Sequence, residues 1–413
     1  MWKKVGPGFV TGAADDDPSG IATYSIAGAR FGYKMTWLSL FLIPSMIAVQ
    51  EMCGRVGMTT GRGLASVIRK YVGKKVMWIS IGMLAFANIV NIGADLGIMA
   101  SSLKMVFGLP FYFWLFLVSM SIVVLEIWVS YKNYSSVLKW LAMSLFVYVI
   151  TAFVVKQNWG EVFNNLFIPR IEWNSLFIMT MVGFAGTTIS PYLFFWQSAE
   201  EVEEEIEENR IVNFEHKPKV SKTMIQTMRF DTNVGMIFSS VIAFFIVVTT
   251  AGTLHANGIL EIAGAREAAE ALRPLAGDMA YLLFALGIVG IGLQAVPVLA
   301  GSVAYAVAEG LGIEEGLNKK FAKARGFYLI LVLATMVGVL MNVWGINTMQ
   351  ALYYAAIVNG VVSVPLIFII IKLADDGRVV GEFKTEKKYR VIAWLTFGFM
   401  AISVLLMFFN WGK

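Results

Sequence analysis

Long apolar stretches dominate the chain and restrict it to a membrane fold. A spanning helix needs about 20 mostly apolar residues, and the sequence holds eleven stretches near that length. Because hydrocarbon offers backbone groups no water, each stretch is expected to be helical. The predicted spans are residues 7–31, 35–53, 76–105, 110–128, 137–155, 175–199, 231–253, 279–311, 327–341, 348–373 and 391–409.

Composition agrees with this assignment. Of the 413 residues, 58% are hydrophobic and 15% charged, and the mean hydropathy is +0.69, which is typical of an all-α polytopic membrane protein. The single cysteine, Cys53, excludes an internal disulfide and any metal centre built from several thiolates. The sequence has no His/Glu metal pair, nucleophile–base arrangement or cofactor motif, so neither an enzyme nor a resident cofactor is expected.

Basic residues predict the orientation. If the N-terminus is cytoplasmic, 25 of the 33 Lys and Arg fall in cytoplasmic segments, as the positive-inside rule requires. Eleven spans then place the C-terminus outside, and a prokaryotic plasma membrane is the expected location. The net charge of +5 reflects this bias. The lipid bilayer is therefore an expected partner, whereas no nucleic acid and no protein partner is indicated.

Two polar stretches lie outside the spans. The run EEVEEEIEENR opens residues 200–229 and predicts a solvated cytoplasmic helix, with a cation-sensing role as the alternative. Residues 254–278 predict a short extracellular helix.

Two spans are interrupted at corresponding places. Pro18 follows three Asp residues in AADDDPSG, and Pro191 follows Ser190 in the sixth span. Proline removes a backbone donor and breaks a helix. Each break opens a set of five spans, which predicts an inverted repeat with halves 1–160 and 161–375 and an additional helix in 376–413. In such repeats the substrate binds near the midplane, between the broken helices.

Asp17 is the acid best placed to serve that site. Ionisable residues inside a membrane are functional by default. Asp17 directly precedes the first break, whereas Asp15 and Asp16 would point about 200° and 100° away around a helix. We therefore expect Asp17 to bind the ligand.

Four motifs resemble the Nramp family of divalent-metal transporters across nearly the whole chain. They are GPGFVTGAADDDPSG from Gly6, GRVGMTTGRGLA from Gly54, GTTISPYLFFWQ from Gly186, and Gln294 ahead of the VAEG that ends at Gly310. The resemblance implies a five-plus-five inverted repeat, shared with sodium-coupled amino-acid symporters. It also implies a transition-metal site of Asp, Asn and Met, with a nearby His that helps to carry protons.

The chain departs from that family pattern at three site positions. Asp17 keeps the family's Asp, but Gly20 replaces the Asn, Ser190 replaces the Met and Tyr192 replaces the His. Losing the thioether removes the soft donor, and oxygen ligands suit Mg²⁺ and Mn²⁺. The smaller side chains also widen the site, which suits an Mg²⁺ ion that keeps part of its water. These departures resemble the magnesium-transporting branch related to Nramp.

The expected metal site combines side chains and freed carbonyls from both breaks. Its members are Asp17, Ser190, Ala14, Gly20, Gly186, Thr187, Thr188 and Gln294. Candidate pathway residues are Tyr192, Asp95, Asn91, Asp231 and Asn359. Simpler roles remain open for several of these, because Asn91 and Asn359 could bridge helices, Tyr192 could be packing, and Asp231 could pair with Arg229.

The sequence therefore predicts a transporter or facilitator that moves Mg²⁺, and also Mn²⁺, into the cytoplasm. Its only histidines, His216 and His255, fall in predicted loops, so transport without proton coupling is expected. A divalent ion gains about 4.6 kcal/mol per 100 mV of inward-negative potential. The alternative is a proton-coupled Mn²⁺/Fe²⁺ transporter of ordinary Nramp type. An amino-acid symporter is less favoured, because three Asp would repel a substrate carboxylate.

Overall fold

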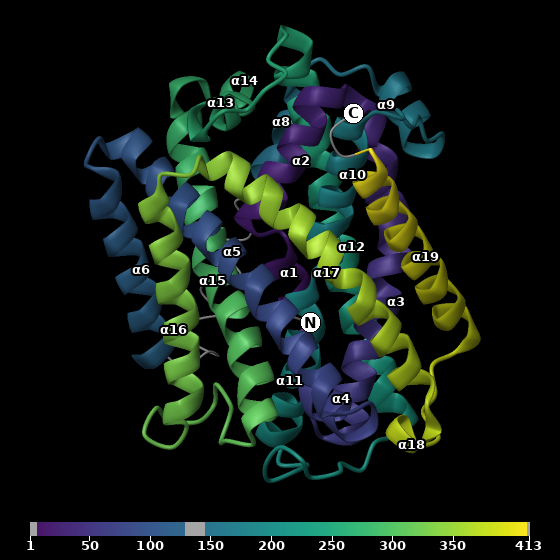
Figure 1. Ribbon diagram of the computed structural model, residues 1–413. Coiled ribbons are helices and arrows are strands. Elements are labelled where there is room, and N and C mark those ends of the chain that lie inside the picture. Colours follow the sequence, from purple (N-terminus) through teal and green to yellow (C-terminus); the bar gives the residue numbers. More distant parts are fainter. Residues whose placement is uncertain (1–5, 129–144, 411–413) are drawn as a thin grey trace.

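The computed structural model describes residues 6–128 and 145–410, and these ranges are helical with short connections (Figure 1). The predicted all-α class is confirmed. The α-helices are α1 (Pro7–Asp15), α2 (Pro18–Phe31), α3 (Thr36–Thr60), α4 (Leu64–Tyr71), α5 (Lys74–Phe107), α6 (Phe111–Trp128), α8 (Phe146–Val154), α9 (Trp159–Phe167), α10 (Ser175–Thr188), α11 (Pro191–Glu207), α12 (Lys222–Thr253), α13 (Ala265–Glu270), α14 (Arg273–Ala276), α15 (Ala280–Leu311), α16 (Arg325–Met341), α17 (Thr348–Asp375), α18 (Gly377–Val380) and α19 (Lys387–Phe409).

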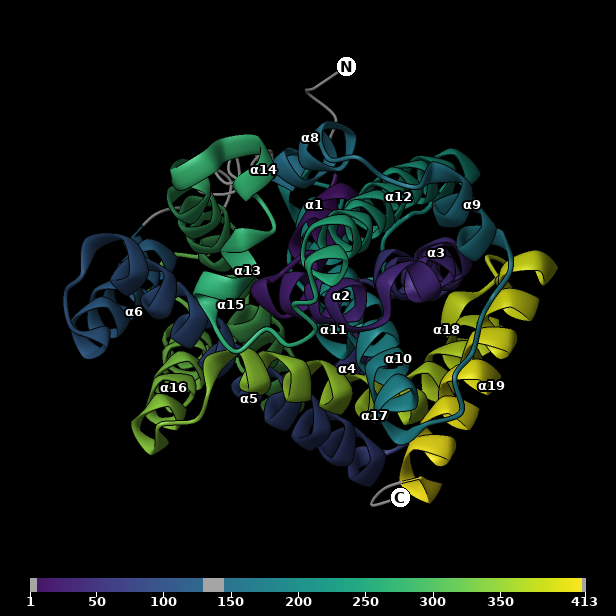
Figure 2. The same cartoon turned by 90° about the horizontal axis from the view of Figure 1, so that it is seen from above.

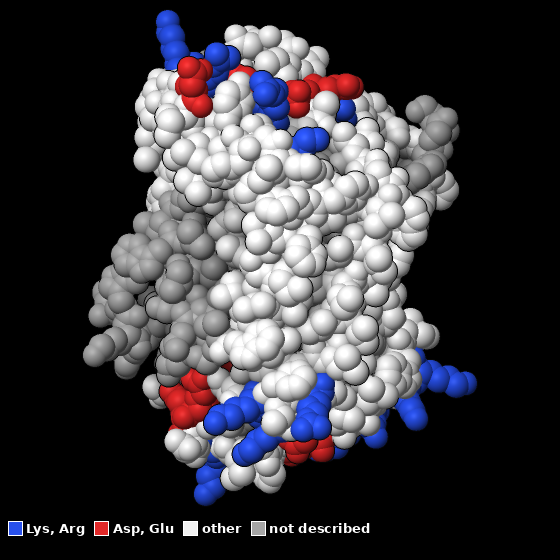
Figure 3. Space-filling model, turned by 90° about the vertical axis from the view of Figure 1, so that its left-hand side faces the viewer, with Lys and Arg blue, Asp and Glu red and all other residues white. Residues whose placement is uncertain are grey.

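The helices are long and apolar enough to cross a bilayer many times. Within the described ranges, nine helical segments meet that requirement, some of which combine two helices. One of them, Pro18–Thr60, contains both α2 and α3, which a 3-10 turn at Gly32–Met35 joins. Of the fifth predicted span, residues 137–144 lie outside the described residues. The face in Figure 3 carries its charged side chains at two opposite ends, separated by a broad uncharged band, which fits a protein embedded in lipid.

Both predicted helix breaks are present. α1 ends at Asp15 and α2 begins at Pro18, whereas α10 ends at Thr188 and α11 begins at Pro191. Each proline therefore stands at the first position of the second half-helix, where a missing N–H costs nothing. Seen from above, the four half-helices lie near the centre, and α6, α16 and α19 lie at the periphery (Figure 2). The breaks are thus held inside the bundle.

Glycines let the broken helices approach their neighbours. A Cβ at Gly12 of α1 would lie 2.3 Å from the carbonyl carbon of Gly235 in α12. A Cβ at Gly186 of α10 would lie 2.3 Å from the backbone nitrogen of Gly360 in α17. Only residues without a side chain permit such backbone contact. The unbroken helices α12 and α17 therefore form the frame against which α1 and α10 pack.

Two further expectations concern segments outside the predicted spans. A short helix in 254–278 is confirmed by α13. The helix predicted after residue 200 is present, since α11 continues to Glu207, but the prediction that it is solvated is wrong, because Glu201, Glu203 and Glu205 are buried. The reason is tertiary: the carboxylate of Glu203 accepts hydrogen bonds from Tyr305 (2.9 Å) and from the loop that follows α15.

The remaining organisation agrees with an appended last helix. α19 packs on α3, α10 and α17 from the outside (Figures 1 and 2). The division into halves 1–160 and 161–375 stays a prediction.

Candidate metal site at the two helix breaks

Asp17 is the N-cap of α2, and its carboxylate is buried, with 1% of the residue exposed. Its Oδ1 accepts hydrogen bonds from the Gly20 N–H (2.7 Å) and the Ser19 hydroxyl (2.7 Å). Its Oδ2 accepts from the side-chain amide of Asn91 in α5 (2.7 Å). The proline break creates this geometry, because the turn before a half-helix leaves backbone donors free for a capping carboxylate.

These contacts leave Asp17 capable of binding a cation. An ionised carboxylate offers about four lone-pair positions, and the three hydrogen bonds occupy three of them. The charge is otherwise unpaired, since no salt bridge to Asp17 occurs in the described ranges. A buried carboxylate without a counter-ion is costly, and a bound cation would remove that cost.

Ser190 holds the corresponding place in the second break. It is the N-cap residue of α11, and its hydroxyl lies 2.8 Å from the Thr187 carbonyl and 2.9 Å from the Gly186 carbonyl, to which it donates. The freed carbonyl of Ile189 accepts a hydrogen bond from Ser363 of α17 (2.6 Å). The hydroxyl oxygen of Ser190 keeps its lone pairs for a ligand, because a donated proton uses neither of them.

Side chains connect the two breaks directly. The Tyr192 hydroxyl donates to the Ala14 carbonyl (2.9 Å). The hydroxyls of Tyr24 and Thr188 lie 2.9 Å apart. All four residues are at most 2% exposed, so the ends of α1 and α10 face each other in a site closed to solvent.

A third link joins Ser19, which was not predicted as a ligand, to the predicted ligand Thr187. The hydroxyls of Ser19 and Thr187 lie 3.4 Å apart, and a Cβ at Gly20 would lie 3.4 Å from the Thr187 hydroxyl. Gly20 therefore adjoins the second break, and a larger side chain there would point at Thr187. The Ala14 carbonyl accepts a hydrogen bond from Tyr192 and keeps a second lone pair, so its role as a ligand stays a prediction.

Three other predicted residues are buried with unsatisfied polar atoms. In the described ranges, Gln294 Oε1 on α15 and both side-chain polar atoms of Asn359 on α17 have no hydrogen-bond partner. The same holds for both oxygens of Asp95 on α5, although its carboxylate interacts electrostatically with the Ser19 backbone and with Asp17. Buried polar atoms normally have partners, so these positions have capacity for water or ligand.

Asp231 does not lie at the breaks. Its carboxylate accepts hydrogen bonds from the N–H groups of Gly6 and Phe9, both at 3.1 Å, so it caps the start of α1. Arg229 forms ion pairs with Glu51 (3.1 Å) and Glu386 (2.7 Å). Asp231 therefore belongs to a second polar region at the far end of α1.

Several polar contacts were missed from the sequence. Asp15 and Asp16, which we expected to diverge, both accept hydrogen bonds from Ser239 of α12 (2.6 and 3.1 Å). Ser19 binds Asp17, although nothing in its sequence context distinguishes it from an ordinary helix residue. Glu51 forms a buried ion pair with Arg55, for which the i, i+4 spacing was an available signal.

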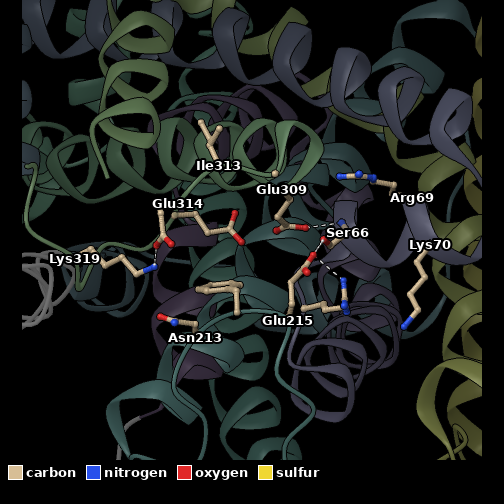
Figure 4. A pocket seen from close by; sticks show the side chains of 13 residues that line it. Ser66, Arg69, Lys70, Asn213, Glu215, Glu309, Ile313, Glu314 and Lys319 are labelled. Carbon is tan, nitrogen blue, oxygen red and sulfur yellow. Dashed lines mark hydrogen bonds and ion pairs between the residues drawn. The ribbon is translucent and has the colours of Figure 1, made fainter. Parts of the chain in front are cut away.

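A separate cavity of about 610 Å³ lies where two of the sequence motifs meet (Figure 4). The Glu309 carboxylate at the end of α15 accepts a hydrogen bond from the Ser66 N–H (2.6 Å) at the start of α4. A Cβ at Gly63 would lie 1.8 Å from that carboxylate. The GRGLA and VAEG motifs therefore meet in a structural contact that joins α4 to α15.

The donor set at the breaks suits a cation that keeps some water. Within the described ranges, no three His, Cys, Asp or Glu side chains are close enough to enclose an ion. Carboxylates, hydroxyls and backbone carbonyls remain, and these oxygen donors suit Mg²⁺, Ca²⁺ and Mn²⁺.

Comparison with known proteins gives a consistent picture. A divalent metal cation transporter MntH of Bacillus subtilis is 24% identical over 417 residues, covering 98% of this chain and 90% of the relative. The crystal structure of a manganese transporter of Eremococcus coleocola has a TM-score of 0.75 at 17% identity, covering 98% of this chain and 86% of that chain. MhsT, in complex with L-phenylalanine, has a TM-score of 0.60 at 12% identity and 98% coverage of both chains. The likeness to these two solved structures shows the shared fold.

The family assignment follows from a match over almost the full length. The model of the natural resistance-associated macrophage protein-like family, Nramp, matches residues 8–410. This range includes both helix breaks, Asp17 and Ser190. The chain belongs to the Nramp family.

Proposed function

We propose that the chain carries divalent metal cations across the membrane into the cytoplasm. The observation that carries this proposal is the buried carboxylate of Asp17 at the first break, without a salt bridge in the described ranges and next to the hydroxyls and carbonyls of the second break. Family membership supports transport rather than catalysis, and the MntH relative is named a divalent metal cation transporter.

Two cations are candidates. The name of the Eremococcus manganese transporter supports Mn²⁺, the ion of our alternative prediction, and favours it over our first expectation of Mg²⁺. The MntH relative is named only for divalent metal cations. The residues at the breaks support a hard cation without distinguishing the two, because Mg²⁺ and Mn²⁺ both accept carboxylate, hydroxyl and carbonyl oxygen. We therefore propose hard-cation transport, with Mn²⁺ and Mg²⁺ as the ions to compare.

A selectivity experiment tests the role of the second break. Ser190→Met introduces a soft thioether, and Gly20→Asn adds an amide beside Thr187. In proteoliposomes supplied with Mg²⁺, Mn²⁺, Ca²⁺ and Cd²⁺ in parallel, we expect Ser190→Met to raise the Cd²⁺/Mg²⁺ uptake ratio by about tenfold, since soft ligands select soft metals. Ser403→Met in α19, also at a buried serine, is the matched control. An unchanged ratio in both break variants would show that these residues do not contact the ion.

Proton coupling needs its own measurement. His216 lies in the loop after α11, and His255 begins a 3-10 turn at the end of α12, so neither stands in the middle of a spanning helix. We propose flux driven by the membrane potential, and the proton-coupled Nramp type is the competing mechanism. A pH-sensitive dye inside the same liposomes should show no acidification when Mn²⁺ or Mg²⁺ enters. Acidification that depends on the cation and on Asp95 would establish coupling instead.

A further inference from the structure

A cavity of about 560 Å³ lies at the start of α1, at the end of that helix opposite Asp17. The start of α1, the end of α11 and the first turns of α12 contribute to its wall. Its acidic lining residues are Glu201, Glu204, Glu207, Glu208 and Asp231. The cavity is therefore acidic, and it is separate from the site between the helix breaks.

The acidic side chains converge because of helical spacing and close packing. Glu201 and Glu204 lie three residues apart, so they share one face of α11, and Glu208 is the C-cap that follows this helix. A Cβ at Gly6 would lie 2.8 Å from Oδ2 of Asp231 and 3.6 Å from Oε1 of Glu204. Two carboxylates from different helices thus approach the same point.

Glu201 supplies an unsatisfied oxygen in this cavity. The residue is 1% exposed. Its Oε1 accepts a hydrogen bond from the side chain of Gln197 (2.7 Å), whereas its Oε2 has no hydrogen-bond partner in the described ranges. The carboxylates of Glu204 and Asp231 repel it. Burying a carboxylate under these conditions costs free energy, and a cation from solvent would offset that cost.

The basic residue in the cavity wall is already engaged. Arg210 forms ion pairs with Glu205 (3.3 Å) and Glu208. Its guanidinium is therefore shared between carboxylates at the edge of the cluster. Glu201 takes part in none of the ion pairs found between described residues.

We propose that Glu201 and Glu204, with Asp231 beside them, bind a partly hydrated divalent cation in this cavity. Carboxylate donors select the hard ions Mg²⁺, Ca²⁺ and Mn²⁺. The ion keeps water because no three acidic, His or Cys side chains in the described ranges enclose a bare ion, and the cavity has room for many waters of about 30 Å³ each.

This site would act on α1, whose other end leads into the break that holds Asp17. Asp231 already holds the N–H groups of Gly6 and Phe9, so a cation beside Asp231 and Glu204 would add charge at the point where α1 is anchored. This proposal does not depend on the proposed transport function. A cation would bind in this cavity whether or not Asp17 binds the transported ion.

Equilibrium binding of radioactive Mn²⁺ to the purified full-length protein tests this site. The background variant is Asp17→Asn, which removes the charge between the helix breaks but keeps a good helix cap. We expect saturable binding to remain in this background, with a Kd on the order of 0.1–1 mM, as for low-affinity carboxylate sites. Adding Glu201→Gln and Glu204→Gln should weaken it at least tenfold.

Glu314→Gln in the same background is the matched control. Glu314 lines the other cavity (Figure 4), and its side chain is 66% exposed, so binding should be unchanged. Gln preserves the size of Glu, and the elution profile in detergent reports folding. If the triple variant does not fold, Glu204→Gln alone in the Asp17→Asn background should still weaken binding. Absence of saturable binding in the Asp17→Asn protein, or equal binding after the Glu→Gln changes, overturns the proposal.

Discussion

Uptake of Mn²⁺ and Mg²⁺ is expected to fall by at least about 100-fold when Asp17 is replaced by alanine. Losing a residue that merely orients a metal ligand already costs roughly 10–100-fold, and Asp17 carries the charge that faces the second break. Initial rates in proteoliposomes at a fixed inward-negative potential measure the effect. Flux at the wild-type rate would rule out Asp17 as the cation ligand.

The variant Asp17→Asn separates the effect of losing the negative charge from the effect of losing the helix cap. Asp17 also caps α2 and accepts a hydrogen bond from Asn91, so the alanine variant loses a cap worth about 1 kcal/mol. Asparagine is an equally good cap but has no negative charge. We expect the asparagine variant to elute and unfold like wild type and yet to transport as poorly as the alanine variant. Asp376→Asn, in the connection between α17 and α18, is the control and should transport normally.

Stability should fall when Gly186 is replaced by alanine. The new Cβ would lie 2.3 Å from the Ala356 carbonyl oxygen and from the Gly360 nitrogen. Both contacts are with backbone, so α10 and α17 must separate. Overpacking of this kind costs about 1–3 kcal/mol or more. Loss of monodisperse protein on heating in detergent, followed by size-exclusion chromatography, measures the change in stability.

Gly398→Ala provides the comparison within the same fold. Gly398 lies in α19, and a Cβ there meets nothing within 4 Å. Alanine is a better helix former than glycine by about 1 kcal/mol, so this variant should be unchanged or more stable. Equal thermal stability of the two variants would mean that α10 and α17 do not pack as closely as the structure shows.

The sequence of this protein alone determines those structural features that each depend on a single segment of the chain. The length of each apolar stretch sets where a helix can cross a bilayer. In hydrocarbon the backbone N–H and C=O groups find no water and must form hydrogen bonds with one another. Pro18 and Pro191 fix the two breaks, because proline cannot donate within a helix. The carboxylate beside the first break was therefore predictable as a ligand candidate, together with Ser190 at the second.

Only the tertiary structure decided which polar groups satisfy one another. Asn91 reaches Asp17 from α5, and Tyr192 donates a hydrogen bond to the Ala14 carbonyl that we expected near the ion. The charge pattern of α11 predicted a solvated helix, yet Glu201 and Glu203 are buried. Such pairings join residues about 70 to 180 positions apart, and their free energy depends on burial and on partners that local sequence does not specify.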